Sequence, residues 1–174
     1  MNTPLTLRLK VIGVGNEWRG DDAAGLLVVR RLKADQLPQV VISECRGTVT
    51  AMREAWNDAA GVIVVDAVVS GGHPGAIYRF NVHGGEVPVE LSRSTSSHGL
   101  GVAEALALGK VFQELPPFLV IYGIEGQNFG PGQELSQEVA AAIPEVVRRI
   151  RREIQTWLGR ESPEGHPPKN GEQS

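Results

Sequence analysis

The sequence predicts an α/β domain in which a mainly parallel, twisted sheet of about five strands lies between helices on both faces, giving three layers. Two observations predict this fold. Apolar runs rich in β-branched residues alternate along the chain with segments of helical periodicity, as they do in βαβ units. The run GVIVVDAVV, residues 61–69, shows no polar alternation before Asp66, so it is expected to be a strand buried on both faces, as strands of parallel sheets are.

The other predicted strands differ in how their apolar side chains are spaced. Residues 75–82, GAIYRFNV, alternate between apolar and polar side chains, which indicates a strand with one polar face at an edge of the sheet. Residues 5–14, LTLRLKVIGV, alternate first and then become continuously apolar, which is typical of a strand that enters a buried sheet. Two further strands are expected at residues 39–44 and 118–125.

Helices are predicted between and after these strands. In residues 22–34, apolar side chains recur at helical spacing and basic side chains face outward. Residues 136–158 favour a long C-terminal helix, and Pro144 within it predicts a kink, because proline cannot donate the helical hydrogen bond. The other helices are expected at residues 48–58 and 98–112.

Length and composition indicate one globular domain. Of the 174 residues, 41% are hydrophobic and 21% are charged, and a single domain is expected over residues 1–158. Residues 159–174 combine proline, glycine and changing charges with almost no apolar content, so we expect a disordered tail. The net charge of −3 gives no basic field, and the sequence therefore predicts no binding to nucleic acid or to an anionic membrane.

The distribution of apolar residues and cysteine narrows the class further. No apolar run is long enough to span a bilayer, and the N-terminal residues lack the regions of a signal peptide. The single cysteine, Cys45, excludes an internal disulfide framework and a cysteine-rich zinc site. We therefore expect a cytoplasmic protein, and a monomer, since no surface stripe stands out as a spare apolar interface.

Ligands of open α/β sheets lie at the carboxyl ends of the strands, which draws attention to the stretch VIGVGNEWRGDDAAG, residues 11–25. Gly13 and Gly15 fit the first two glycines of a dinucleotide fingerprint, but Trp18 stands where the third is required. No P-loop lysine follows, and two acids at the start of a helix would repel a phosphate there. A nucleotide site is not expected.

Three side chains near predicted strand or helix ends could bind a metal. Asp21 or Asp22 could cap the following helix, which is worth ~1 kcal/mol, but only one residue can be the N-cap. Asp66 ends a run of valines, where a carboxylate is costly unless it is hydrogen-bonded, paired or metal-bound. His98 follows the polar stretch SRSTSS and opens a helix, a place where an isolated histidine often just faces solvent. Together, Asp22, Asp66 and His98 would suit a divalent ion such as Ni²⁺ or Zn²⁺.

These motifs resemble those of the [NiFe]-hydrogenase maturation endopeptidases. The similarity in order and spacing extends to about residue 158. The matching residues are Gly13, Gly15 and Asn16, then Asp21, Asp22 and Gly25, then VIVVDAVVSGGHPG around Asp66 and STSSHGLG around His98.

The resemblance implies an endopeptidase of the aspartyl type that removes the C-terminal extension of a hydrogenase large-subunit precursor after nickel insertion. It also implies that Asp22, Asp66 and His98 contact nickel and act in catalysis. The nickel would come with the precursor, and Zn²⁺ or Cd²⁺ could substitute for it in vitro. A non-catalytic nickel-binding chaperone of the same precursor is the alternative. Gly13, Gly15 and Asn16 would shape the loop that presents Asp22, and Asp21 would cap the helix and hold that loop.

One stretch departs from the family pattern. Many members carry a turn like Asp-Gly-Gly-Thr after the second strand, and this turn is associated with substrate discrimination. Here the stretch is ECRGT, in which Cys45 and Arg46 replace the Asp and the first Gly while Gly47 and Thr48 remain. The hydrogenase class of the precursor is therefore left open. No histidine lies near Cys45 in the sequence, so an inert thiol is expected rather than a nucleophile.

Overall fold

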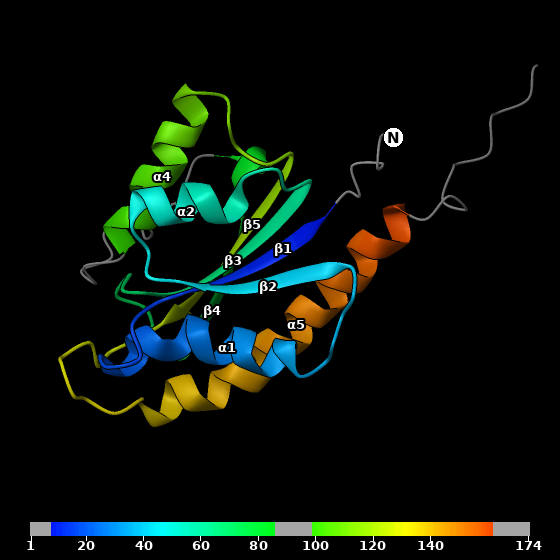
Figure 1. Ribbon diagram of the computed structural model, residues 1–174. Helices are drawn as coiled ribbons and strands as arrows, with labels where there is room; N and C mark the ends of the chain where they lie inside the picture. The colour runs from blue at the N-terminus through cyan, green and yellow to red at the C-terminus, as the bar shows by residue number, and fades with distance from the viewer. Residues whose placement is uncertain (1–7, 86–98, 162–174) are drawn as a thin grey trace, which may run out of the picture.

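The computed structural model describes residues 8–85 and 99–161, and it confirms the predicted three-layer α/β architecture (Figure 1). The sheet has five strands in the order β2-β1-β3-β5-β4. Four of them are parallel, and β4 lies antiparallel to β5. The alternation of its side chains predicted the position of β4 at an edge of the sheet, but not its direction. The strands are β1 (Leu9–Val14), β2 (Val40–Cys45), β3 (Gly61–Val68), β4 (Ile77–Asn81) and β5 (Phe118–Glu125).

Helices cover both faces of the sheet (Figure 1). On one face lie α1 (Ala24–Lys33), which follows the 3₁₀ turn η1 (Gly20–Ala23), and α5 (Gln137–Glu161). On the other face lie α2 (Val49–Trp56) and α4 (Gly99–Val111). A second 3₁₀ turn, η2 (Val82–Gly84), follows β4. The C-terminal helix continues through Pro144 and ends three residues beyond its predicted limit of 158, at Glu161.

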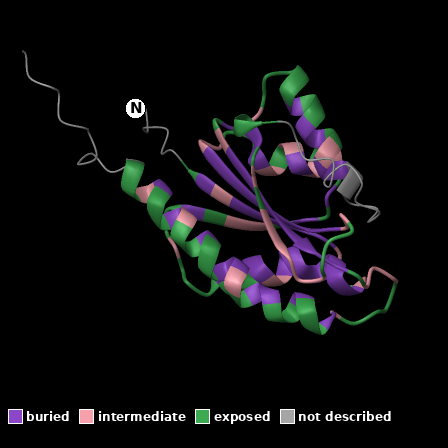
Figure 2. Cartoon of the chain, turned by 180° about the vertical axis from the view of Figure 1, so that it is seen from behind, coloured by how far each residue is buried: buried purple, intermediate pink, exposed green. Residues whose placement is uncertain are grey.

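Two apolar clusters, one on each face of the sheet, form the core. Every residue of β3 is buried, as predicted for a strand with helices on both sides, and Figure 2 shows the central strands mostly buried while the helices expose their outer sides. Full burial of a Val, Ile or Leu side chain contributes about 1.5–3 kcal/mol, so these clusters supply the main stabilising free energy. In the described part of the chain, no helix combines the length and apolarity needed to cross a bilayer.

The parallel strands bring distant parts of the chain to one edge of the sheet. Val14 at the end of β1 pairs with Cys45 at the end of β2. On the other side of β1, Gly13 pairs with Val65, the residue before Asp66. The loop after β1, the turn after β2 and the end of β3 therefore meet at the carboxyl edge, where ligands of such folds lie.

Candidate functional site

Glycines allow α1 to lie unusually close to the sheet at this edge. A Cβ on Gly13 would meet the carbonyl oxygen of Gly25, and a Cβ on Gly25 would meet the carbonyl oxygens of Val65 and Val14. These obstacles are backbone atoms, which cannot turn aside as a side chain can. The close packing sets η1, and with it Asp22, directly after β1 and over the end of β3.

The loop between β1 and η1 folds back on itself. Gly15 has a φ of +152° and donates its backbone N–H to the carbonyl of Cys45 at 3.1 Å, while a Cβ on Gly15 would collide with the carbonyl of Asp22. Asn16 donates its backbone N–H to that same Asp22 carbonyl at 3.2 Å, and its side-chain oxygen accepts from the backbone N–H of Trp18 at 3.0 Å. Gly15 and Asn16 thus determine the path of the chain that carries Asp22.

Asp21 does not cap α1, contrary to the sequence-based prediction. The N-cap position is Ala23, without a side-chain hydrogen bond, because η1 carries the chain into the helix and places Asp21 inside that turn. The fully buried Asp21 carboxylate instead accepts from the backbone N–H groups of Gln127, Asn128 and Ser136 at 2.7–2.9 Å, and from the Ser136 hydroxyl at 3.0 Å. It therefore ties η1 to the loop after β5 and to the start of α5.

Asp22 and Asp66 are brought together at the carboxyl edge, and each is only 1% exposed. Burial raises the pKa of the Asp66 carboxyl well above its usual range, and the charge of Asp22 raises it further, while a hydrogen bond from the Ala67 backbone N–H opposes the shift. The Oδ1 atom of Asp66 is buried without a hydrogen-bond partner among the described residues. Two carboxyl groups in such a place favour keeping a proton or binding a cation.

The third predicted ligand, His98, lies outside the described residues. The chain next to it is described: α4 begins at Gly99, and a Cβ on Gly101 would collide with the carbonyl of Gly47 in the turn after β2. The first turn of α4 thus packs against the same edge of the sheet as Asp22 and Asp66. Residues 8–85 and 99–161 contain no group of three or more His, Cys, Asp or Glu side chains that could hold a metal ion. The described part of the chain therefore contributes two carboxylates to the predicted set.

The four residues of the divergent turn have different surroundings. Cys45 is buried, its sulfur accepts from the Gly47 backbone N–H at 3.4 Å, and burial raises its thiol pKa, which is the environment of an unreactive thiol. Gly47 has a φ of +78°, and the Thr48 hydroxyl caps α2 by accepting from the Ala51 backbone N–H at 3.2 Å. Arg46 alone of the four presents a charged side chain at the surface.

A cavity of about 340 Å³ opens beside the loop that carries Asp22. Its charged side chains could not be grouped from the sequence, because they lie on separate elements and meet only in the fold. Trp18 was the one signal in the sequence, because a bulky side chain stands where a dinucleotide fingerprint has its third glycine. In the structure this tryptophan is 74% exposed. The cavity is lined by Gly15, Asn16, Glu17, Trp18, Leu26, Arg30, Glu44, Cys45 and Arg46.

Known proteins share both the sequence and the fold. A sequence profile of the family described as hydrogenase maturation protease matches residues 28–153, a range that includes Asp66 and His98 and begins after Asp22. The hydrogenase 2 maturation protease of Escherichia coli (strain K12) is 30% identical over 149 residues, which cover 83% of this chain and 88% of the relative.

Solved structures give the same result. The hydrogenase maturating endopeptidase HybD from E. coli has a TM-score of 0.72 at 25% identity, covering 86% of this chain and 93% of that one. The [NiFe] hydrogenase maturation protease HybD from Thermococcus kodakarensis has a TM-score of 0.67 at 25% identity, covering 84% and 98%. Because the profile and the relatives extend over most of the chain, this protein belongs to the hydrogenase maturation protease family.

Proposed function

We propose that this chain is an endopeptidase that removes the C-terminal extension of a [NiFe]-hydrogenase large-subunit precursor after nickel has been inserted, and that it recognises the nickel held by the precursor. The observation that carries the nickel proposal is the pair Asp22 and Asp66, both buried at the edge where ligands of this fold bind. Family membership supports the peptidase role.

The two carboxylates fit a cation that arrives with other ligands already attached. Their oxygens would offer two ligands, His98 would add an imidazole, and the remaining coordination positions would stay with the precursor. Nickel bound there would polarise the scissile carbonyl as a Lewis acid. A cation beside Asp66 would also offset the burial and the repulsion by Asp22 that raise the pKa of its carboxyl. Under this proposal, the chain binds nickel only weakly in the absence of the precursor.

Mass spectrometry of the precursor tests the proposal. We expect loss of a C-terminal peptide from the nickel-loaded precursor and an unchanged mass for the nickel-free form. His98→Ala should abolish cleavage and change the free energy of unfolding by no more than about 0.5 kcal/mol, since it removes a ligand rather than core packing. His73→Ala is the matched control, because His73 is exposed in the loop after β3, and it should cleave like the wild type.

Two other outcomes would contradict the proposal. Full activity of His98→Ala, or unfolding of that variant, would remove His98 from the site. Nickel-dependent binding of precursors whose masses never change would instead indicate the non-catalytic chaperone. We place the reaction in the cytoplasm and take the chain to act as a monomer, which sedimentation of the purified protein would test.

A further inference from the structure

We propose that the cavity beside Asp22 binds an extended segment of the precursor next to the scissile bond, with Trp18 as its aromatic wall and Arg46 as the cation that receives an acidic side chain of that segment. This inference rests on the proposed function, because the precursor is the occupant. It adds a recognition site with a stated chemistry, separate from the residues proposed to contact nickel.

Trp18 is held in place and yet presented to solvent. Its backbone N–H donates to the Asn16 side chain at 3.0 Å, and its carbonyl accepts from the Gly132 backbone N–H at 2.8 Å. Its side chain remains 74% exposed, whereas the other tryptophans, Trp56 and Trp157, are 2% and 7% exposed. Tryptophan and arginine are the residues most enriched where a few side chains dominate binding. A fixed backbone also lowers the entropy lost when a partner packs on the ring.

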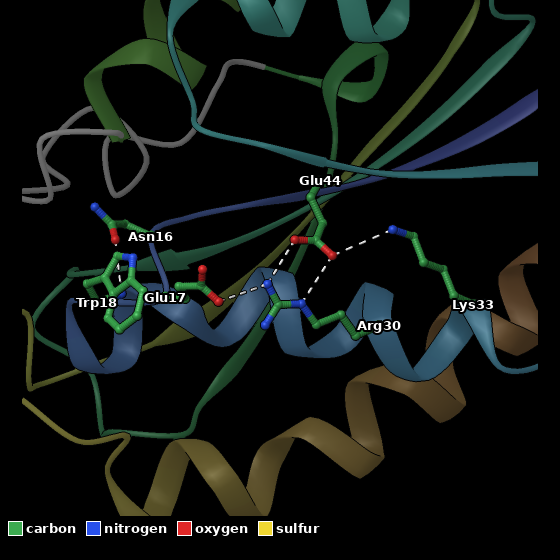
Figure 3. Close-up of polar contacts among 6 residues, drawn as sticks. All are labelled: Asn16, Glu17, Trp18, Arg30, Lys33 and Glu44. Carbon is green, nitrogen blue, oxygen red and sulfur yellow. Dashed lines mark hydrogen bonds and ion pairs between the residues drawn. The ribbon is translucent and has the colours of Figure 1, made fainter.

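The charges on the cavity wall determine which segment it favours. Arg30 donates to both Glu44 oxygens at 3.0–3.1 Å and to Glu17 at 3.1 Å, and Lys33 lies 3.5 Å from Glu44 (Figure 3). These two acids and two bases neutralise one another. Arg46 lines the same cavity and has no ion-pair partner among the described residues, so its positive charge is not offset by a paired carboxylate of the wall. An arginine in that position favours a carboxylate, which it can bind through two N–H groups.

The cavity adjoins the carboxylate pair, although neither Asp22 nor Asp66 lines it. Asn16, in the cavity wall, donates its backbone N–H to the carbonyl of Asp22, and the neighbouring Gly15 donates its N–H to the carbonyl of Cys45. Cys45 also lines the cavity and is close enough to Asp66 for the charge of Asp66 to raise its thiol pKa, as burial does. A peptide in the cavity would therefore run next to Asp22 and Asp66, where the scissile bond must lie.

A label that reports only on this chain tests the occupant. The protein is made with 5-fluorotryptophan, its three ¹⁹F resonances are assigned with Trp→Phe variants, and unlabelled nickel-loaded precursor is added to the His98→Ala variant, in which cleavage is blocked. We expect the Trp18 resonance to shift or broaden on binding while those of the buried Trp56 and Trp157 stay unchanged.

Kinetics test the charge. Arg46→Glu should raise KM by about tenfold with kcat little changed, and Arg46→Lys should retain part of the affinity. Arg152→Glu, with the same charge change at an exposed position of α5, is the control. Precursors in which each acidic residue near the scissile bond is changed singly to Lys should include one that the wild type cleaves poorly and Arg46→Glu cleaves well.

The outcomes separate the two proposals. If the wild type cleaves the precursor and the His98→Ala variant binds it, but the Trp18 resonance and the KM of Arg46→Glu do not change, the recognition site is wrong and the proposed function stands. If no precursor is bound or cleaved by the wild type, the proposed function fails and the recognition site fails with it.

Discussion

Asp21 and Asp22 are adjacent in the sequence and both are buried, yet their carboxylates have different surroundings. Asp21 is surrounded by donors from a loop more than a hundred residues later, at separations of 106 to 115 positions. Asp22 lies close enough to Asp66 for its charge to raise the pKa of the Asp66 carboxyl, as burial does. In this motif, Asp21 holds η1 in place, and Asp22 is the carboxylate that η1 brings to the candidate site.

We predict that Asp21→Ala lowers the free energy of unfolding by about 3 kcal/mol or more, because three backbone N–H groups, of which that of Ser136 is buried, lose their acceptor at once. Urea denaturation measures the change. Glu104→Ala, at an exposed position of α4, is the control and should stay within about 0.5 kcal/mol of the wild type. Wild-type stability in Asp21→Ala would mean that this carboxylate does not hold the two segments together.

For Asp66→Asn we predict a more stable protein that no longer cleaves. Burial and the charge of Asp22 raise the pKa of Asp66 in the folded state, so the folded chain binds the carboxyl proton more tightly than the unfolded chain does. The wild type therefore loses stability as the pH rises from the ordinary carboxyl pKa of about 3.9 through the raised pKa of the folded state. The variant carries no charge and avoids this loss. Its advantage should amount to about 1.4 kcal/mol for each unit by which the pKa is raised.

Unfolding measured over a pH series provides the internal control for Asp66→Asn. Near and below the ordinary carboxyl pKa, wild type and variant should be equally stable, and the difference should grow only above it. A constant difference at all pH values would show that the amide, and not the missing charge, causes the change.

Local sequence patterns were sufficient to find Asp66, Asp22 and His98 as candidates. Asp66 interrupts an apolar run, and this is visible without any fold. The role of Asp21 could not be found in the same way, because its partners come from the loop after β5 and the start of α5. Local propensity favoured a helix cap there, and tertiary hydrogen bonds determined the outcome instead.

At the level of elements, the sequence predicted each strand and helix of the described part to within a few residues, since apolar periodicity is decided locally. The 3₁₀ turn η1 was missed because it depends on the bonds of Asp21 and on the close approach of α1 to the sheet. That approach needs glycine at two facing positions, Gly13 and Gly25. These two motif glycines do not form a phosphate site, and they are explained instead by the packing of α1 against the sheet.

Gly25→Ala should therefore destabilise the protein by about 1–3 kcal/mol, even though alanine is the better helix former by about 1 kcal/mol. Its methyl group would meet backbone carbonyls of β1 and β3 and push α1 outward. Gly159→Ala in α5 is the matched control: no atom lies within 4 Å of its added Cβ, so it should be neutral or stabilising. Chemical denaturation of both variants decides this, and equal effects would contradict the packing argument.

At the scale of the whole molecule, the candidate site draws on all three layers. The turn η1 comes from the layer of α1 and α5, Asp66 comes from the central strand β3, and the start of α4 belongs to the opposite layer. The order of the strands, which brings the ends of β1, β2 and β3 together, could not be predicted from periodicity alone, because pairing is decided between distant segments. A site built from all three layers needs the whole fold, and the sequence similarity to the relatives accordingly extends over most of the chain.

The position of the last core side chains predicts where the functional domain ends. Ile154 and Trp157 are the last core side chains, and Trp157 packs beside Gly61 at the start of β3. Residues 162–174 contain none of the hydrophobic residue types. A chain shortened to residues 1–161 should keep its free energy of unfolding within about 0.5 kcal/mol and cleave as the full chain does.

Shortening the chain to residues 1–153 is the contrasting case. It keeps the Glu153 carboxylate, which accepts hydrogen bonds from Arg79 and Tyr122, but it removes the core side chains of Ile154 and Trp157. Losing a buried Ile and a buried Trp costs about 2–5 and 3–5 kcal/mol, a sum comparable with the about 5–15 kcal/mol that hold a domain folded. We therefore expect this shorter chain to be largely unfolded in circular dichroism and inactive. If the 1–161 chain also loses stability, residues 162–174 pack on the domain, and the domain extends beyond the end of α5.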